Sequence, residues 1–392
     1  MAKRYFRCET DKAPHTYLVG ETVTFRLSYR CDGERAEAHS FRFKILGDAG
    51  YEREGVVSGE SGEMILSESF RAPGFLYLEV EALSASGEPI PDSTVFRGGA
   101  GAEIEKIRLE TKEPQGYRRF WECCRAELYA VDPTVIKIER LDPDPEHPDH
   151  DAYDLTIAAP GGVPVSGILT LPRQKGKYPA RVSYHSYGVR SAISEYSGGE
   201  IVLNINAHGL PNRRPKSYYD ELRDGRLSGY GFDKEQNLSP HTCYFKYVML
   251  RAAQALRYLM TRPEWDGKTL TAKGGSQGAV QALHAARLVP EVSLVDIWVP
   301  WLCDINAETA GRRTGWGDRT EDAVLYFDSA LCAAFVTQKT RVLAGLGDTT
   351  SPPAGVVAMV KNLGGEHSLT LVQGREHGSA SPEAVAFEVD GI

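Results

Sequence analysis

A serine within a glycine-rich turn is the residue with the clearest chemistry in the chain. Gly274, Ser276 and Gly278 fill the pattern G-x-S-x-G, after a strand-like run and before an Ala-rich helical run. A serine hydroxyl is a weak nucleophile at neutral pH, so it needs a neighbouring base and a backbone bend that presents its oxygen. The pattern makes that bend, and the first N–H groups of the helix favour an oxyanion. We therefore predict Ser276 as a nucleophile and the N–H of Gln277 as an oxyanion donor.

The pattern alone does not identify a nucleophile, because Gly-rich turns also fill it by chance. The predicted elements around the turn decide between these two interpretations. Residues 247–260 have the apolar spacing of a helix, and 263–267 have the composition of a turn. Residues 279–288 are expected to form a second helix that ends before Pro290, and 292–299 a strand. Helix, turn, strand, serine turn, helix and strand is the order that this chemistry needs.

An acid and a histidine should follow the serine in chain order, each just beyond a later strand. Residues 341–346 have the composition of a strand, and Asp348 lies in the loop after it. Residues 369–372 form the next predicted strand, and His377 lies in its exit loop. In this scheme His377 accepts the Ser276 proton, while Asp348 fixes the histidine tautomer and stabilises the imidazolium.

Other residues compete for these two roles. Alternative acids downstream of the serine are Asp304, Asp318 and Asp322. Only Asp348 ends a strand in the expected order. His367 precedes the last predicted strand and belongs at the opposite sheet edge, while His284 lies inside a helix, where packing is its expected role. Glu376 adjoins the catalytic candidate His377, so its side chain should point away from that ring.

The remaining site predictions concern the oxyanion hole and the substrate pocket. Residues 180–184 are expected to form a strand, and the loop after it carries Tyr187, whose backbone N–H is the predicted second oxyanion donor. Bulky side chains from several loops are expected to wall the pocket. These are Tyr187, His208, Trp301 and Trp316.

Length and composition limit the classes of protein to which the chain can belong. The 392 residues favour two domains, and the net charge of −8 argues against nucleic acid or an anionic membrane as the main partner. No run of about 18 apolar residues spans a membrane. Residues 1–7 lack an apolar core, so no signal peptide is expected, which leaves a cytoplasmic protein or an exported one whose signal has been removed.

No metal or cofactor is expected from the sequence. The seven cysteines are odd in number and lack metal-type spacing, which favours free thiols. The segment 141–151 contains Asp and His, but its prolines favour a solvated loop over a metal site.

The chain divides into two predicted domains. Residues 1–105 alternate with period two and are expected to form a small all-β sandwich, with 98–101 as a glycine-rich linker. Its aromatic side chains suit core packing better than carbohydrate binding. Residues 106–392 are expected to form the second domain, in which strands and helices alternate, so we predict a mostly parallel sheet with helices on both faces. The long excursion 208–237 is expected to be functional or a lid.

With these residues in view, the chain resembles the acetyl xylan esterase and cephalosporin C deacetylase family, carbohydrate esterase family seven. This resemblance implies an α/β-hydrolase fold for the second domain. The resemblance rests on three stretches in the right order, Gly274–Gly278, Pro300–Asp304 and Gly345–Pro353. The chain departs from the family at Asn206–Gly209, where an Arg-Gly-Gln turn is usual, and at Arg375–Gly378, where Gly-His-Glu is usual. Ala279 also replaces a glycine. The triad positions are retained.

The resemblance implies a serine esterase that removes acetyl groups from acetylated sugars, oligosaccharides or xylan. The expected partner is therefore a small-molecule or oligosaccharide acetyl ester. Two alternatives stay open: an esterase or peptidase for another small acyl substrate, and a catalytically inactive carbohydrate-binding protein. The resemblance also implies a homo-oligomer, although the added β-domain leaves the assembly open.

Overall fold

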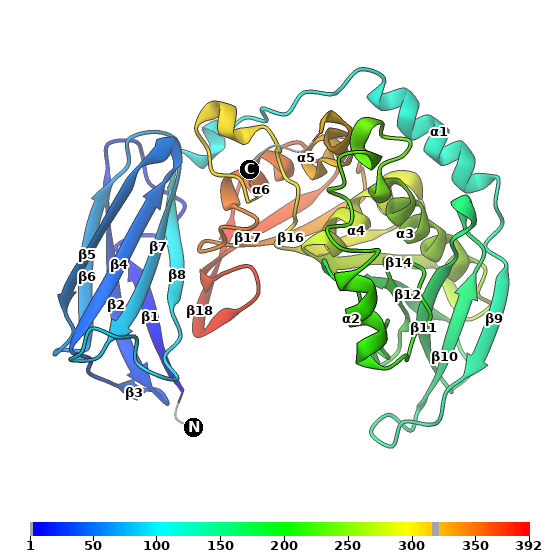
Figure 1. The fold of residues 1–392 in the computed structure, drawn as a ribbon, viewed down its shortest axis with the longest axis horizontal. Coiled ribbons are helices and arrows are strands. Elements are labelled where there is room, and N and C mark those ends of the chain that lie inside the picture. Colours follow the sequence, from blue (N-terminus) through cyan, green and yellow to red (C-terminus); the bar gives the residue numbers. More distant parts are fainter. Residues whose placement is uncertain (1–2, 316–320) are drawn as a thin grey trace.

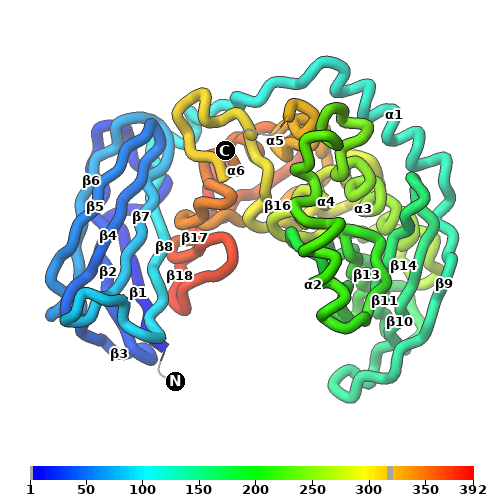
Figure 2. Tube along the Cα trace, viewed as in Figure 1, coloured from blue at the N-terminus to red at the C-terminus, as the bar shows by residue number. Residues whose placement is uncertain are grey.

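The computed structural model describes residues 3–315 and 321–392. An N-terminal group of strands lies at one end of the molecule, and a large twisted sheet with its helices fills the rest (Figure 1). The chain trace shows residues 103–116 crossing from the first part to the far side of the second (Figure 2). No helix among the described residues is long and apolar enough to cross a membrane.

The N-terminal part consists of two four-stranded sheets whose strands all pair antiparallel. Successive side chains alternate between buried and exposed, and the buried ones, including Phe6, Phe25, Tyr29 and Phe41, form one apolar core. The first sheet contains β1 (Arg4–Thr10), β2 (Thr22–Cys31), β3 (Glu34–Arg35) and β6 (Glu63–Ser69). The second contains β4 (Ser40–Gly47), β5 (Glu52–Ser58), β7 (Gly74–Leu83) and β8 (Phe96–Ala102).

The predicted linker at residues 98–101 is wrong, because these residues lie within strand β8. They pair with β7 and are buried. Their glycines reflect close packing: a Cβ on Gly99 would lie 2.3 Å from the carbonyl oxygen of Leu76 and 2.8 Å from that of Leu346. A run of glycines therefore marks here a strand against which other backbone packs directly.

The second part is built on a sheet of ten strands, in the order β18-β17-β16-β15-β14-β12-β13-β11-β10-β9. The strands from β13 to β17 pair parallel, and those at the two ends pair antiparallel. Their bounds are β9 (Val135–Arg140), β10 (His150–Ile157), β11 (Val165–Pro172), β12 (Tyr178–Tyr184), β13 (Ile201–Asn206), β14 (Trp265–Gly275), β15 (Leu294–Trp298), β16 (Lys339–Gly345), β17 (His367–Arg375) and β18 (Ala380–Val389).

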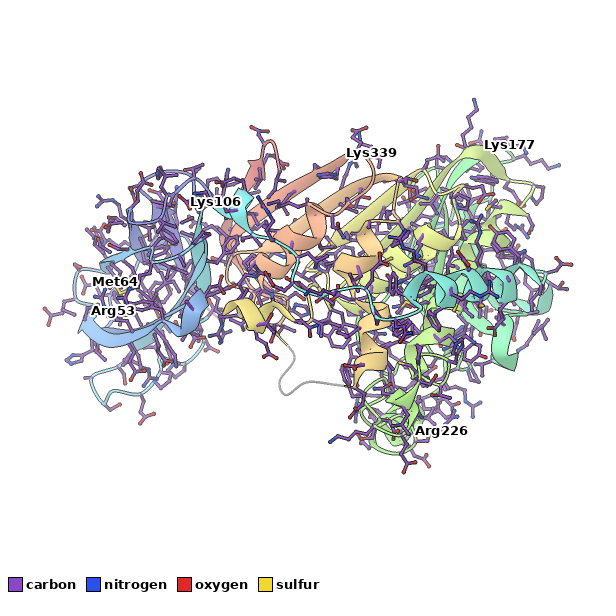
Figure 3. The ribbon with its side chains drawn as sticks, turned by 90° about the horizontal axis from the view of Figure 1, so that it is seen from above. Arg53, Met64, Lys106, Lys177, Arg226 and Lys339 are labelled. Atoms are coloured by element: carbon purple, nitrogen blue, oxygen red, sulfur yellow. The ribbon has the colours of Figure 1, made fainter. Side chains whose placement is uncertain are left out.

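Helices with almost wholly buried side chains pack on the parallel strands. Helix α4 (Gln277–Leu288) contacts β12, β14 and β15, α3 (Tyr244–Met260) packs beside it, and α6 (Pro353–Val360) contacts β16 and β17. The remaining helices are α1 (Tyr117–Tyr129), which contacts α3, α2 (Lys216–Asp224), and α5 (Ser329–Ala333), which joins α4 and α6. Lys177 and Lys339, at the starts of β12 and β16, mark the amino edge of the parallel strands (Figure 3).

Two edge strands escaped the sequence analysis. β18 alternates only weakly between exposed and half-buried positions, so its pattern carries little signal, and all of β9 is exposed. β18 has a functional consequence, because it forms a hairpin with β17 and the loop of that hairpin carries His377. The excursion 208–237 also contains a helix, α2.

Replacing Gly99 by Ala is predicted to destabilise the protein, because a Cβ there would overlap two backbone carbonyl groups. Overpacking of this kind costs about 1–3 kcal/mol. The measurement is the midpoint of urea unfolding. The matched control is Gly198→Ala, where a Cβ meets nothing within 4 Å. Equal midpoints for both variants would contradict the close packing of β8.

Candidate active site

The turn that carries Ser276 connects β14 to α4 at the carboxyl edge of the sheet. Ser276 has φ 55° and ψ −122°, a strained conformation that is typical of a nucleophile at such a turn. The structure shows why both positions that flank Ser276 in the pattern are glycines. A Cβ on Gly274 would lie 2.5 Å from backbone atoms of Gly278, and one on Gly278 would lie 2.3 Å from the carbonyl oxygen of Tyr184.

The structure brings Ser276, His377 and Asp348 together in one hydrogen-bonded chain. The Oγ of Ser276 lies 2.8 Å from Nε2 of His377, and Nδ1 of His377 lies 2.9 Å from Oδ2 of Asp348. An ionised carboxylate only accepts hydrogen bonds, so Nδ1 of the neutral ring carries the proton. Nε2 is then free to accept the proton of the serine hydroxyl. This is the arrangement that a general base needs.

The carboxylate of Asp348 is held by its own loop. The side chain is fully buried, and its Oδ1 accepts hydrogen bonds from the N–H groups of Thr350 at 2.9 Å and Ser351 at 2.7 Å. Burial with several donors fixes the direction of the other oxygen. The N–H of Gly347 also donates to the carbonyl of Arg375 at 3.0 Å, which ties the acid loop to the strand that leads to the histidine.

The N-terminal part of the chain supports the histidine loop. Arg97 of β8 forms an ion pair with Glu376, the residue before His377. The side chain of Gln373 makes two hydrogen bonds of 2.9 Å with the backbone of Gly99, one to its N–H and one to its carbonyl. Gln373 lies near the end of β17, and Glu376 lies in the loop after it. Their contacts with β8 therefore help to hold the loop that carries His377.

Two amide N–H groups, those of Gln277 and Tyr187, are the predicted oxyanion donors. Gln277 begins α4, where the first N–H groups have no acceptor within the helix. The second candidate, Tyr187, lies in the loop after β12, and this loop is joined to the serine turn because Ser186 Oγ donates to the carbonyl of Gly275 at 3.1 Å. Within the described residues, no hydrogen-bond acceptor is assigned to either amide.

Tyr230, which the sequence analysis did not single out, connects both oxyanion candidates. Its hydroxyl accepts a hydrogen bond from Gly188 N–H at 2.9 Å and donates one to the side-chain oxygen of Gln277 at 3.0 Å. Its ring stacks on Tyr187 with centroids 4.4 Å apart. The residue comes from the excursion 208–237, whose length indicated a function, although no local pattern indicated this residue.

Trp301 lies close to the serine turn but is 91% buried, with 9% of its surface exposed. Its backbone N–H donates to the carbonyl of Ser276 at 3.4 Å. Its ring contacts Tyr187, Phe232 and Phe245, with centroids 6.0, 5.5 and 6.2 Å away. The Tyr187 side chain is 42% exposed. Among the predicted pocket residues, these two share one aromatic cluster.

The structure places His208 behind this cluster, in contact with the edge of Tyr230 at 4.5 Å between ring centroids. Its Nε2 lies 3.1 Å from the Gly188 carbonyl, which can only accept, so this nitrogen carries the proton. Nδ1 then accepts from the Tyr244 hydroxyl at 2.8 Å. Burial lowers the pKa of His208 to about 3, so the ring is neutral near pH 7. Trp316 lies outside the described residues.

Of the three alternative acids, Asp304 and Asp322 lie among the described residues. Asp304 is fully buried and makes a 2.5 Å ion pair with Arg312, and it accepts hydrogen bonds from the backbone and hydroxyl of Thr111. It organises the segment after β15 and is not hydrogen-bonded to His377. Asp322 begins a short 3₁₀ helix, and Asp318 lies outside the described residues.

The rival histidines are held in packing positions. His284 is fully buried in α4, its ring stacks on Trp121 at 4.6 Å, and Nε2 donates to the carbonyl of Phe327 at 3.2 Å. Burial lowers the pKa of His284 to about 3. His367 begins β17, at the end opposite His377, with Nε2 3.0 Å from the carbonyl oxygen of Ile392.

Comparison with known proteins adds family evidence to this geometry. The model of the acetyl xylan esterase family (AXE1) matches residues 101–310. The acetyl esterase Axe7A of Xylanibacter ruminicola is 26% identical over 323 residues, which cover 76% of this chain and 70% of that protein. Two solved acetyl xylan esterases share the fold. That of Paenibacillus sp. R4 has a TM-score of 0.59 at 23% identity, and that of Thermoanaerobacterium sp. JW/SL YS485 has 0.56 at 19%. Each alignment covers 71% of this chain and 94% of the other.

A mostly parallel sheet that presents serine, histidine and aspartate at the carboxyl edge of its strands is typical of serine hydrolases. The match to the family model spans more than half of the chain, and the chain therefore belongs to the acetyl xylan esterase family. It is a carboxylic ester hydrolase.

Replacing Arg97 by Ala is predicted to lower kcat by up to about fivefold, because the histidine loop loses a partly exposed ion pair worth up to about 1 kcal/mol. The KM for p-nitrophenyl acetate should change little. The measurement is steady-state kinetics below the unfolding temperature. Arg42→Ala, which removes an exposed ion pair with Glu81 in the same sheet, is the control and should leave kcat unchanged. Equal kcat in both variants would show that β8 does not position His377.

Proposed function

We propose that this protein removes acetyl groups from acetylated sugars, oligosaccharides or xylan, using Ser276, His377 and Asp348 through a covalent acyl-enzyme. The single observation that carries this proposal is the chain of two hydrogen bonds, 2.8 and 2.9 Å long, that runs from the serine to the buried carboxylate. Family membership supports the acetyl ester as the substrate class.

The mechanism has two halves. His377 accepts the Ser276 proton as the serine oxygen attacks the acetyl carbonyl, and the N–H groups of Gln277 and Tyr187 stabilise the resulting oxyanion. Collapse of this intermediate releases the sugar alcohol, which takes the proton from His377, and leaves acetyl-Ser276. Water then attacks this ester and its proton passes to His377. The bond between Ser276 Oγ and the acyl carbon breaks, Oγ takes the proton back from His377, and acetic acid leaves and ionises to acetate. Asp348 holds the imidazole in place and stabilises its charged form.

The fold supports a finer description of the two parts. We propose residues 1–105 as a β-sandwich domain, because its two sheets enclose a core of their own. We propose residues 106–392 as an α/β-hydrolase domain, because the serine turn, the acid and the histidine follow β14, β16 and β17 in chain order. Apolar residues near the boundary, such as Ile104 and Ile107, belong to the second core.

We propose that the acyl site is narrow near the serine, which would favour acetyl over longer acyl groups. The Trp301 backbone donates to the Ser276 carbonyl, and its ring packs between Tyr187 and Phe232. The alternatives of another small-acyl esterase and of a peptidase use the same triad, so the preferred acyl group and the bond that is cleaved, ester or amide, decide among them. A catalytically inactive binding protein is disfavoured, because it has no need for an intact hydrogen-bonded chain.

Ser276→Ala is predicted to lower kcat for p-nitrophenyl acetate by about 10⁶, the typical cost of losing a triad nucleophile. Asp348→Asn should lower it by about 10⁴, because the amide cannot hold the correct histidine tautomer. Acetate release from acetylated xylooligosaccharides should fall in parallel.

The control for the acid is Asp304→Asn, another fully buried aspartate, assayed only while it remains folded by circular dichroism. Its activity should remain well above that of Asp348→Asn. A crippled Asp304→Asn beside a nearly silent Asp348→Asn would show that the acid is misassigned.

The wild-type protein is predicted to hydrolyse acetyl esters at least about tenfold faster in kcat/KM than butyryl esters, because each methylene changes binding by about 1–3 kcal/mol. Trp301→Phe should reduce this ratio while keeping the aromatic contacts that fill the core. The measurement is kcat/KM for the two p-nitrophenyl esters. Trp265→Phe, at the start of β14, should keep the wild-type ratio. Equal wild-type rates on both esters would rule out a narrow acyl site.

A further inference from the structure

A cavity of about 430 Å³ lies beneath the excursion after β13, apart from the residues of the triad. Its lining combines arginine with tyrosine. The residues that matter here are Arg226, Arg251, His208, Tyr218, Tyr244 and Tyr247. Of the described residues that line it, none is an aspartate or glutamate. The cavity therefore has positive charge and no anion of its own.

Arg251, on helix α3, is the unusual member of this lining. Only 3% of its surface is exposed, and its Nε and Nη2 both donate to one carbonyl, that of Ala207, at 3.1 and 2.7 Å. Within the described residues, no carboxylate forms an ion pair with it. Burial lowers its pKa to about 10, yet the group is still charged near pH 7. A buried charge without a counterion is unfavourable, so an external anion would relieve that cost.

Arg226 adds a second charge on the solvent side. It is exposed, lies in the segment after α2 and carries no ion pair within the described residues. Figure 3 shows it at the outer edge of the molecule, opposite the edge that carries Lys177 and Lys339. An entering anion would meet this arginine first and reach Arg251 at depth. Arginine is suited to this role because its guanidinium pairs with a carboxylate in two places.

The rest of the lining favours a sugar ring as the body of the ligand. Tyr218, Tyr244 and Tyr247 offer rings and hydroxyl groups, and Gln236 and Thr242 add amide and hydroxyl groups. His208 is neutral, so it contributes no charge. Aromatic faces with scattered polar groups suit a compact ring that is apolar on its faces and polar at its edges.

We propose that this cavity binds a sugar acid, with the ligand's carboxylate paired with Arg251 and its ring against the tyrosines. The site is separate from the acetyl-binding site, because Tyr230 and the carbonyl of Gly188 lie between His208 and the serine turn. His208 still donates to the residue next to Tyr187, so an occupant would contact the back of the oxyanion loop.

The test is isothermal titration of the full-length protein with D-glucuronate, using glucose, the methyl ester of glucuronate and inorganic sulfate as comparisons. Glucuronate should bind at least about tenfold more tightly than glucose or the ester, because only it can pair with a guanidinium. Equal affinity for glucose, or tighter binding of sulfate, would overturn the proposal.

Substitutions inside and outside the cavity test whether glucuronate binds there. Arg226→Glu should weaken glucuronate binding at least tenfold, while Arg223→Glu, an exposed arginine on α2 that is already paired with Asp220 and Asp224, should not. Arg251→Met should abolish binding if it folds by circular dichroism. Ser276→Ala should bind glucuronate as the wild type does. Unchanged affinity in Arg226→Glu, or loss of binding in Ser276→Ala, would overturn the assignment to this cavity.

Discussion

His377 makes two hydrogen bonds, one to Ser276 and one to Asp348, and these require three separate loops to meet at one point. They join loops that follow three different strands, β14, β16 and β17. Such loops meet only where parallel strands end at one edge. The run of parallel pairing from β13 to β17 is therefore what makes the site possible. Gly274 and Gly278 meet the same need locally, because no Cβ fits at either position.

The N-terminal strands, which are not part of the ten-stranded sheet, also contact the loops of this site. Strand β8 lies against the acid and histidine loops, and a Cβ on Gly347 would lie 2.3 Å from the backbone of Arg97. Gln373 and Glu376, which flank the turn at Gly374, are both bound to β8. A histidine on a hairpin loop at the sheet edge has few neighbours of its own, so these contacts limit its movement.

Local sequence patterns explain which parts of the candidate site could be predicted. The turn around Ser276, and the loops with Asp348 and His377, follow strong apolar strands, and the sequence placed these elements in the order that the structure has. The run Gly98–Gly101 was misread, because glycine marks both flexible linkers and close-packed strands, and only the neighbouring backbone distinguishes them. Tyr230 carries no local signal, since its contacts with Gly188 and Gln277 come from distant parts of the chain.

The two arginines that line the cavity, Arg226 and Arg251, illustrate the same limit. Arg251 lies on α3, where the other buried residues are mostly apolar. Only the fold shows that it is buried, without a carboxylate partner among the described residues, beside the segment that carries Tyr230. Sequence periodicity gives the buried face of a helix, but the charge balance of a cavity depends on which segments meet there.

We propose that Ser276 is the nucleophile that forms the acyl-enzyme. The most direct measurement is labelling with a fluorophosphonate, which reacts with activated serine hydroxyls, followed by peptide mass mapping of the adduct. We expect one phosphonyl group per chain, carried by Ser276, with loss of esterase activity in proportion to labelling. Full activity after labelling of Ser276, or inactivation by an adduct on a different residue, would contradict it.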